Sequence, residues 1–307
     1  MSTPISRSVG SRSDTALSHR DPTRHGGRRF AGRRALVTGA SRGIGAAIAR
    51  RLAAEGADVA ITARTLDAHP TLPGSLHETA QHVERHGGKV AVVVADMADP
   101  QDRARIVPEA VDALGGPIDV LVNNAAAAIY QPLRDYPLRR RLLTFEVNVH
   151  GPLDLAQAVV PSMVERGDGW IVNLSSGSAR LFRMPPEDDG VLSTTITIYG
   201  ASKAALNRLT NGLAAELYGT GVRVNTIEPR AAVLSEGADK LVGDKLRPDQ
   251  IESMEEMVEA TVALCDCTPE RTGHVEVSLD LIDELGLTVM DLDGEAPAAL
   301  DRRGARE

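Results

Sequence analysis

The 307-residue chain contains few aromatic side chains and only two cysteines. One Trp, four Tyr and three Phe are too few for the stacking platforms that bind single-stranded nucleic acid. Cys265 and Cys267 are separated by one residue, so neither a mutual disulfide nor a framework of bridges is expected, and a reducing cytoplasm is the expected compartment. No apolar run reaches the roughly 18 residues of a membrane helix, so no membrane partner is expected.

Basic charge is scarce outside the first residues. The formal net charge is −8, yet residues 1–34 hold eight Arg and two Asp, so the rest of the chain is acidic. An acidic body argues against nucleic acid as a partner. Hydrophobic residues make up 42% and charged residues 25% of the chain, which is typical of a soluble globular protein and excludes disorder over the whole length.

The two ends of the chain differ from the middle in composition. Residues 1–31 are rich in Ser, Arg and Gly and predict a disordered extension that adds nothing to the core. A transit peptide of similar composition and a weak polyanion-binding arm are alternatives, whereas no apolar segment typical of a secretory signal is present. Residues 288–307 turn to Asp, Gly, Pro and Arg and predict a flexible tail. A single domain is expected over residues 32–287.

Short apolar runs alternate with helical patterns from Arg34 onward. The expected strands lie at 35–37, 59–61, 90–94, 120–122, 170–172, 222–224 and 274–277. This alternation predicts an α/β fold with a Rossmann-like, doubly wound parallel sheet of about seven strands. The run 90–94 is apolar at every position, which fits a strand covered by helices on both faces. The segments 64–75 and 180–195 are expected to be loops.

A glycine-rich turn follows the first expected strand and precedes an amphipathic helix. It reads TGASRGIG over residues 38–45. Glycine lets a pyrophosphate approach the backbone closely, and a helix N-terminus supplies free N–H groups and positive potential. The turn therefore predicts a dinucleotide site.

The spacing T-G-x-x-x-G-x-G resembles that of the short-chain dehydrogenase/reductase family, and further motifs of this family follow in order over residues 32–280. They are Asp96, Asn123-Asn124-Ala125-Ala126, Asn148, Ser176, Tyr199 with Lys203, and Pro229-Arg230. The resemblance implies an oxidoreductase whose catalytic residues are Asn148, Ser176, Tyr199 and Lys203. It implies cofactor contacts from Gly39, Ser41, Arg42, Gly43, Ile44, Gly45, Arg64, Asp96, Met97, Asn123, Ala125, Tyr199, Lys203, Pro229 and Arg230. The loop 64–74 is similar to one in the hydroxysteroid-dehydrogenase-like branch of the family.

Two arginines favour NADP(H) over NAD(H). Arg42 lies in the glycine-rich turn and Arg64 follows the second strand, where an acidic residue would hold a free ribose 2′-hydroxyl. No carboxylate occurs there before Asp67. Because guanidinium groups suit a 2′-phosphate, NADP(H) is the expected cofactor.

The spacing of Tyr199 and Lys203 places both on one helix face, where the ammonium would lower the pKa of the phenol. The resemblance implies hydride transfer between nicotinamide C4 and a carbonyl or carbinol carbon, with Tyr199 as general acid/base. It further implies that Ser176 binds the substrate oxygen and that Asn148 holds a water linking Lys203 to solvent. The expected partners are a small carbonyl or alcohol substrate and further copies of the chain, in a homodimer or homotetramer that uses the apolar face of 204–217.

Some features depart from the family pattern. The segment between Ser176 and Tyr199 is unusually long, and its apolar residues Leu181, Phe182 and Met184 are expected to form a pocket wall, with residues 187–189 in solvent. Arg230 replaces a glycine that borders the nicotinamide. No metal is expected, because the histidines at 82 and 86 fit a solvated helix face and the two cysteines fit helix-end packing.

Two other functions remain open at this point. The chain could be a catalytically silent NADP(H)-binding regulator, although the complete set of four catalytic residues argues against that. A hydrolase using Ser176 lacks the nucleophile-elbow pattern and a histidine partner.

Overall fold

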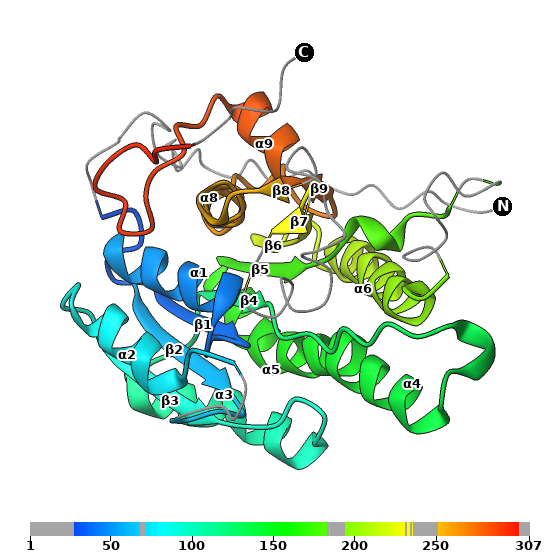
Figure 1. Ribbon diagram of the computed structural model, residues 1–307. Helices are drawn as coiled ribbons and strands as arrows, with labels where there is room; N and C mark the ends of the chain where they lie inside the picture. The colour runs from blue at the N-terminus through cyan, green and yellow to red at the C-terminus, as the bar shows by residue number, and fades with distance from the viewer. Residues whose placement is uncertain are drawn as a thin grey trace, which may run out of the picture.

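Seven parallel strands form the centre of the computed structural model, which describes residues 28–67, 72–182, 184, 194–230, 232–233, 235 and 251–300 (Figure 1). They are β1 (Arg34–Thr38), β2 (Asp58–Ala63), β3 (Val90–Val94), β4 (Val120–Asn123), β5 (Gly169–Leu174), β6 (Val222–Glu228) and β9 (Val275–Val277). Their order in the sheet is β3-β2-β1-β4-β5-β6-β9. All seven expected strands and the doubly wound class are confirmed.

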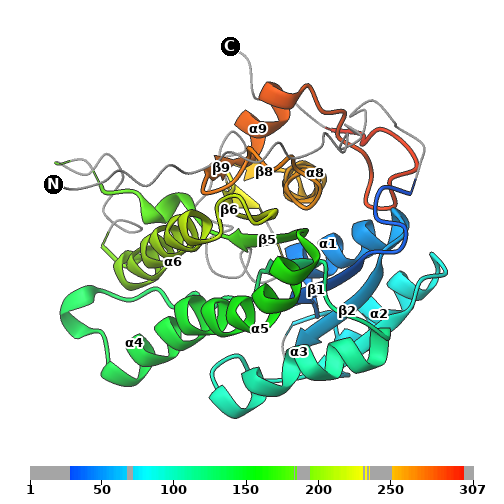
Figure 2. The same cartoon turned by 180° about the vertical axis from the view of Figure 1, so that it is seen from behind.

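Helices cover both faces of this sheet (Figures 1 and 2). One face packs on α1 (Gly43–Ala54), α2 (Leu76–Glu84), α8 (Met254–Leu264) and α9 (Ser278–Leu285), and the other on α3 (Pro100–Leu114), α5 (Gly151–Arg166) and α6 (Thr197–Glu216). Side chains of β1 alternate between them, with Ala35 and Val37 in the first core and Leu36 in the second. Among the described residues, no helix is long and apolar enough to cross a bilayer.

Local sequence signals fix where several helices begin and end. Helix α3 begins after Asp99, whose side chain accepts a hydrogen bond from the Gln101 amide, and it ends at Gly115 with a φ of 75°. Helix α8 begins with a reciprocal capping box between Ser253 and Glu256. These caps satisfy N–H and C=O groups that a helix end leaves without a partner.

A long helical rod runs beside α6. Helix α4 (Leu138–Phe145) continues through a π-helical turn, Glu146–His150, into α5, and α4 packs against α6 (Figure 2). A small parallel pair, β7 (Ala232–Val233) and β8 (Ile251–Glu252), was not expected from the sequence. Short 3-10 turns occupy Leu133–Asp135 and Gly177–Ala179.

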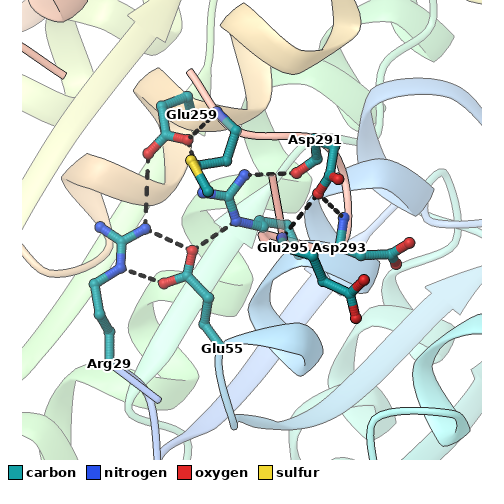
Figure 3. A network of polar contacts seen from close by, with 8 residues as sticks. Arg29, Glu55, Glu259, Asp291, Asp293 and Glu295 are labelled. Carbon is teal, nitrogen blue, oxygen red and sulfur yellow. Dashed lines mark hydrogen bonds and ion pairs between the residues drawn. The ribbon is translucent and has the colours of Figure 1, made fainter. Parts of the chain in front are cut away.

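Both ends of the described chain pack more tightly than their composition predicts. Phe30 is 2% exposed within the core, so the expectation that residues 1–30 add nothing to the core is wrong at this position. Val289 is buried, and residues 288–300 lie beside α1, where Arg50 pairs with Asp293. The Arg51 guanidinium also donates to the Asp291 carbonyl (Figure 3). The expected tail is therefore part of the fold up to residue 300, whereas 1–27 and 301–307 lie outside the described residues.

The strand order reverses between β1 and β4, which are neighbours in the centre of the sheet. In open α/β sheets a ligand binds at such a switch point, outside the carboxyl ends of the strands. The carboxyl ends here are Thr38 of β1 and Asn123 of β4. We call the rim formed by the carboxyl ends of β1, β2, β4, β5 and β6 the carboxyl edge.

Candidate active site

The turn between β1 and α1 is shaped by three glycines, two with left-handed backbone and one in close contact with its neighbours. Gly39 and Gly43 have φ values of 65° and 56°, in the left-handed region. A Cβ on Gly45 would lie 2.3 Å from Asn124 Nδ2 and 2.6 Å from the Gly39 carbonyl oxygen. Asn124 Nδ2 in turn donates to the Thr38 carbonyl at 2.8 Å, so the end of β4 pins this turn.

The N-terminus of α1 opens onto the same turn. Its N-cap residue, Arg42, makes no side-chain cap, and no acidic residue occupies the first helical turn. The N–H groups and the positive end of the helix dipole therefore stay available to an anion. Ser41 is buried and Ile44 packs against the core beneath, which anchors the helix start. A backbone cradle without side chains beside a helix N-terminus fits the pyrophosphate of a dinucleotide.

The two arginines expected at the ribose contact different groups. Arg42 donates to the carbonyls of Pro73 and Gly74, at 2.9 and 3.0 Å, and so holds the loop before α2. Arg64 is 70% exposed, with Nη1 3.9 Å from Asp96 Oδ2. Asp96 Oδ1 accepts from the Ala98 amide at 2.9 Å. Of the two guanidinium groups, that of Arg64 therefore has fewer close contacts within the protein.

Two of the expected cofactor residues direct their side chains into the core. Met97 is 6% exposed and packs in the core beneath α3 and α5. Asn123 Nδ2 donates to Asn173 Oδ1 at 2.8 Å and is buried between strands. The Ala125 amide donates to the Thr38 hydroxyl at 3.0 Å. The Met97 side chain is therefore directed away from a cofactor, and the buried Asn123 amide is tied to Asn173 through Nδ2, with Oδ1 left without a partner among the described residues.

Ser176, Tyr199 and Lys203 lie together at the carboxyl edge. Ser176 follows β5 and is hydrogen-bonded to Tyr199, which lies in the first turn of α6. Lys203, one helical turn later, has Nζ 5.7 Å from the centroid of the Tyr199 ring and donates to the Leu174 carbonyl at 2.7 Å. The shared helix face expected from the sequence is confirmed.

Asn148 ties two elements of the site together from the π-helical turn. Its Oδ1 accepts from the Ala127 amide at 2.7 Å, and its Nδ2 donates to the Ser202 hydroxyl at 2.9 Å. Ser202 Oγ donates to the Tyr199 carbonyl at 2.6 Å. Such π-turns inside α-helices are frequent at functional sites. Asn148 is fully buried, so its contacts fix the loop after β4 against the start of α6.

Burial dominates the ionisation of this cluster. Burial raises the pKa of the Tyr199 phenol well above its ordinary value, the neighbouring Tyr130 adds to the rise, and the hydrogen bond with Ser176 opposes it. Burial lowers the pKa of Lys203 to about 8. The expected lowering of the phenol pKa by Lys203 is therefore not found: burial raises that pKa, and the group that opposes the rise is Ser176, whereas the Lys203 ammonium donates to the Leu174 carbonyl.

Comparison with known proteins decides the family. A family model described as short chain dehydrogenase matches residues 33–244. The chain belongs to the short-chain dehydrogenases.

The relatives support this in sequence and in structure. Hydroxysteroid dehydrogenase-like protein 2 of Danio rerio is 30% identical over 270 residues, covering 88% of this chain and 62% of the relative, so the chain spans about three fifths of that relative. A short chain dehydrogenase of Mycobacterium thermoresistibile superposes with a TM-score of 0.73 at 29% identity, covering 89% and 95% of the two chains. A gluconate 5-dehydrogenase of Burkholderia cenocepacia in complex with NADP and tartrate gives 0.68 at 28% identity, covering 81% and 94%.

This short-chain dehydrogenase differs from the expectation at Arg230. Its guanidinium pairs with Asp280 and lies 3.7 Å from Asp283 Oδ2, both on α9, and its amide donates to Glu252 Oε2 at 3.0 Å. The cation expected beside the nicotinamide is therefore neutralised by α9. Pro229 before it is half-buried at the end of β6.

The walls of the expected pocket also differ. Leu181 is 97% and Met184 80% exposed, so neither forms a wall in this structure, and Phe182 is 43% exposed. The acidic residues 187–189 lie outside the described residues. These side chains leave the short turn Gly177–Ala179 toward solvent because no described element packs over them.

Sequence reasoning missed two groups at the carboxyl edge. The ring of Tyr130 lies 5.8 Å from that of Tyr199, tilted by 59°. Glu228, the last residue of β6, is 1% exposed, with Oε1 paired to Arg180 and Oε2 without a partner among the described residues. The available signal was a position at the end of a strand for Glu228, and a position in the loop that follows β4 for Tyr130.

Metal-ligand clusters of three or more His, Cys, Asp or Glu do not occur within the described ranges. His86 Nε2 lies 3.3 Å from Asp293 Oδ1. Cys265 is the buried C-cap residue of α8, which confirms the expected helix-end packing. Burial raises the pKa of the Cys267 thiol to about 12.

Proposed function

We propose that this short-chain dehydrogenase interconverts an alcohol and a ketone or aldehyde with NADP(H), using Tyr199 as general acid/base. The observation that carries the proposal is the hydrogen-bonded pair of Ser176 and Tyr199, with Lys203 one helical turn away. A phenol, a hydroxyl and an ammonium at one site are the groups that proton transfer to a reacting oxygen needs. The glycine cradle at the start of α1 lies on the same carboxyl edge.

The cofactor would be held mainly by backbone groups and by two cationic side chains, Arg64 and Lys203. The turn around Gly43 and the N-terminus of α1 would take the pyrophosphate, and Arg64 with Asp96 would flank the adenosine. Lys203 is the buried cation beside Tyr199. When bound, the dinucleotide supplies or accepts the hydride, and its oxidised nicotinamide brings a positive charge.

During reduction the Tyr199 hydroxyl donates its proton to the substrate oxygen as the carbon gains a hydride, so a carbonyl becomes an alcohol. The raised pKa keeps the phenol protonated and ready to donate. Ser176 donates a hydrogen bond to the same oxygen, and the Lys203 ammonium lies 5.7 Å from the centroid of the ring that carries the phenolate. Asn148 acts on this chemistry by positioning, since it joins Ala127 to Ser202. Oxidation follows the same steps in reverse.

NADP(H) is favoured over NAD(H) by the end of β2. That strand ends at Ala63 and is followed by the exposed guanidinium of Arg64, and the sequence after the strand has no carboxylate before Asp67. The Burkholderia gluconate 5-dehydrogenase, which is similar in structure, is complexed with NADP. We infer that NADPH binds at least about tenfold more tightly than NADH, which corresponds to about 1.4 kcal/mol.

A homodimer or homotetramer is part of the proposal. Leu209 on α6 and two leucines on the adjoining α4, Leu138 and Leu142, are exposed on neighbouring helices. Burying them against a second copy would remove apolar surface from water. Light scattering should give a multiple of the 32.6 kDa chain mass, and a monomer at micromolar concentration would contradict this part.

The direct test is consumption of NADPH with a panel of ketones and aldehydes, in parallel with NADH. Turnover with NADPH, at a lower cofactor Kd than for NADH, supports the proposal. Tight NADPH binding without turnover of any carbonyl compound, or of any alcohol in the reverse direction with NADP, would instead support a silent regulator. Equal dissociation constants for NADPH and NADH would contradict the cofactor choice alone.

A further inference from the structure

Tyr130 brings a second phenol against the one proposed to transfer the proton. It lies in the loop after β4, and its ring centroid is 5.8 Å from that of Tyr199, with the planes tilted by 59°. Tilted aromatic pairs at this separation attract each other, so the two rings support each other's positions. Nothing in the proton transfer itself requires Tyr130, because Ser176 already bonds the Tyr199 hydroxyl.

The backbone on both sides of this second phenol is held by hydrogen bonds. On one side, the Tyr136 hydroxyl donates to the Ile129 carbonyl at 3.0 Å. On the other, the Gln131 amide donates to the Thr195 carbonyl at 2.9 Å, and the Arg140 guanidinium donates to Gln131 Oε1 at 2.7 Å. The backbone that carries the ring is therefore held in place before any ligand arrives, which lowers the entropy that binding must overcome.

The hydroxyl of Tyr130 has no hydrogen-bond partner among the described residues, although the side chain is half-buried. Burial raises the pKa of this phenol, so its hydroxyl stays protonated across the physiological range and can donate. A half-buried donor beside a reacting group, fixed in place and left without a protein acceptor, fits an acceptor on the ligand.

We propose that Tyr130 is a specificity residue whose hydroxyl binds a second oxygen of the substrate, on a carbon adjacent to the reacting carbon. The substrate class is then a vicinal hydroxy ketone, hydroxy aldehyde or diketone. The two ring centroids are 5.8 Å apart and a phenol donates over about 2.7–2.8 Å, so the proposal requires the two substrate oxygens to lie close together, as they do on adjacent carbons. This inference rests on the proposed function, since Tyr199 must serve the reacting oxygen.

The geometry also explains why a plain ketone would be a poorer substrate. A ligand without the second oxygen would exclude water from the Tyr130 hydroxyl and give it no acceptor. Sites built to bond a polar group discriminate against analogues that lack it far more strongly than apolar pockets sense a missing methylene. Discrimination should therefore depend on the hydroxyl of Tyr130 and not on its ring.

The test compares matched pairs of probe carbonyl compounds: hydroxyacetone with acetone, butanedione with butanone, and longer pairs of the same kind. Steady-state reduction by the full chain with NADPH is measured for the wild type and for Tyr130→Phe, which keeps the ring. We expect kcat/KM to fall about tenfold or more for the oxygenated member and less than about twofold for the plain member. The exposed Tyr218 provides the matched control, and Tyr218→Phe should change neither.

Two further readouts separate specificity from structure. The NADPH Kd and the melting temperature of Tyr130→Phe should equal those of the wild type. An equal loss for both members of each pair, or a shifted pH profile with both, would mean that Tyr130 acts only through Tyr199 and would overturn the inference. No change for either member would overturn it as well.

If the wild type reduces plain and oxygenated members equally, the inference fails while the proposed function stands. If it reduces neither, with NADPH or NADH, the proposed function itself fails.

Discussion

Two clusters of buried polar groups in this dehydrogenase differ in how completely the protein satisfies them. Around Arg51, the guanidinium contacts Glu55 at 2.6 Å, Glu259 at 2.7 Å and the Asp291 carbonyl at 3.0 Å, while Arg29 pairs with the same two glutamates (Figure 3). Burial alone would raise the pKa of Glu55, but the hydrogen bond and charge of Arg29, together with Arg51, lower it. Each of these charges has an opposite partner.

At the carboxyl edge, by contrast, buried polar atoms lack hydrogen-bond partners among the described residues. Four buried side-chain polar atoms lack a partner among the described residues, and three of them belong to the last or next-to-last residue of a strand: Thr62, Asn123 and Glu228. The half-buried Tyr130 and the N-terminus of α1 add further polar groups for which the described residues provide no partner. Unsatisfied buried groups are destabilising unless a ligand or water completes them. The polar cluster around Arg51 holds the two ends of the described chain in the fold. The carboxyl edge, where polar groups lack partners, is suited to bind a ligand.

The largest effect is expected from Tyr199→Phe, which removes the proton donor and little volume. Turnover should fall by about 100- to 10,000-fold, as is typical for loss of acid/base catalysis, with the NADPH Kd unchanged. Single-turnover hydride transfer measures the chemical step directly. If the variant keeps more than about a tenth of the wild-type rate, less than about 1.4 kcal/mol of barrier, Tyr199 is not the donor.

Arg51→Met breaks the polar cluster around Arg51. It leaves two buried glutamates with Arg29 alone, so the free energy of unfolding should fall by about 3–5 kcal/mol. Arg50→Met is the matched control, because the neighbouring Arg50 is 29% exposed and its pair with Asp293 should contribute less than about 1 kcal/mol. Urea titration of both variants checks this. Equal losses of unfolding free energy in the two variants would show that the buried cluster contributes no more to stability than the exposed pair.

The seven strands and the shared helix face of Tyr199 and Lys203 were predictable because their signals are local: apolar runs and a four-residue spacing. The packing of residues 288–300 was not, because Arg50 and Arg51 meet Asp293 and Asp291 across more than two hundred residues of sequence. Composition alone made that segment resemble a loose tail. The pairing of Arg230 with α9 and the position of Tyr130 depend on tertiary contacts in the same way.

Gly45→Ala is expected to damage the cradle at the carboxyl edge. Its Cβ would meet Asn124 Nδ2 and the Gly39 carbonyl, so the turn must shift and the NADPH Kd should rise at least about tenfold. Gly212→Ala is the control, because a Cβ there would enter open space on α6 and should leave NADPH binding unchanged. Calorimetric titration of the two variants measures both. An unchanged Kd in Gly45→Ala would remove this turn from the binding site.

The smallest effect is a pH dependence from Lys203. Burial lowers its pKa to about 8, so the ammonium is present below that pH and is lost above it, whereas an exposed lysine would keep its charge to higher pH. If the charge contributes to cofactor binding, the NADPH Kd should be constant up to about pH 8 and rise up to about tenfold by about pH 9. Lys203→Met should bind more weakly and without this pH dependence. A flat wild-type profile would exclude Lys203 from binding.

Hydrogen exchange with and without NADPH tests the contrast between the two clusters most directly, because local exchange reports which backbone amides a ligand covers. In the first minutes of labelling, NADPH should slow exchange at 38–46 and 122–126, on the carboxyl edge, and leave 291–295, beside Arg51, unchanged. Absence of slowing at 38–46, or equal slowing at 291–295, would contradict the assignment of the carboxyl edge as the ligand site.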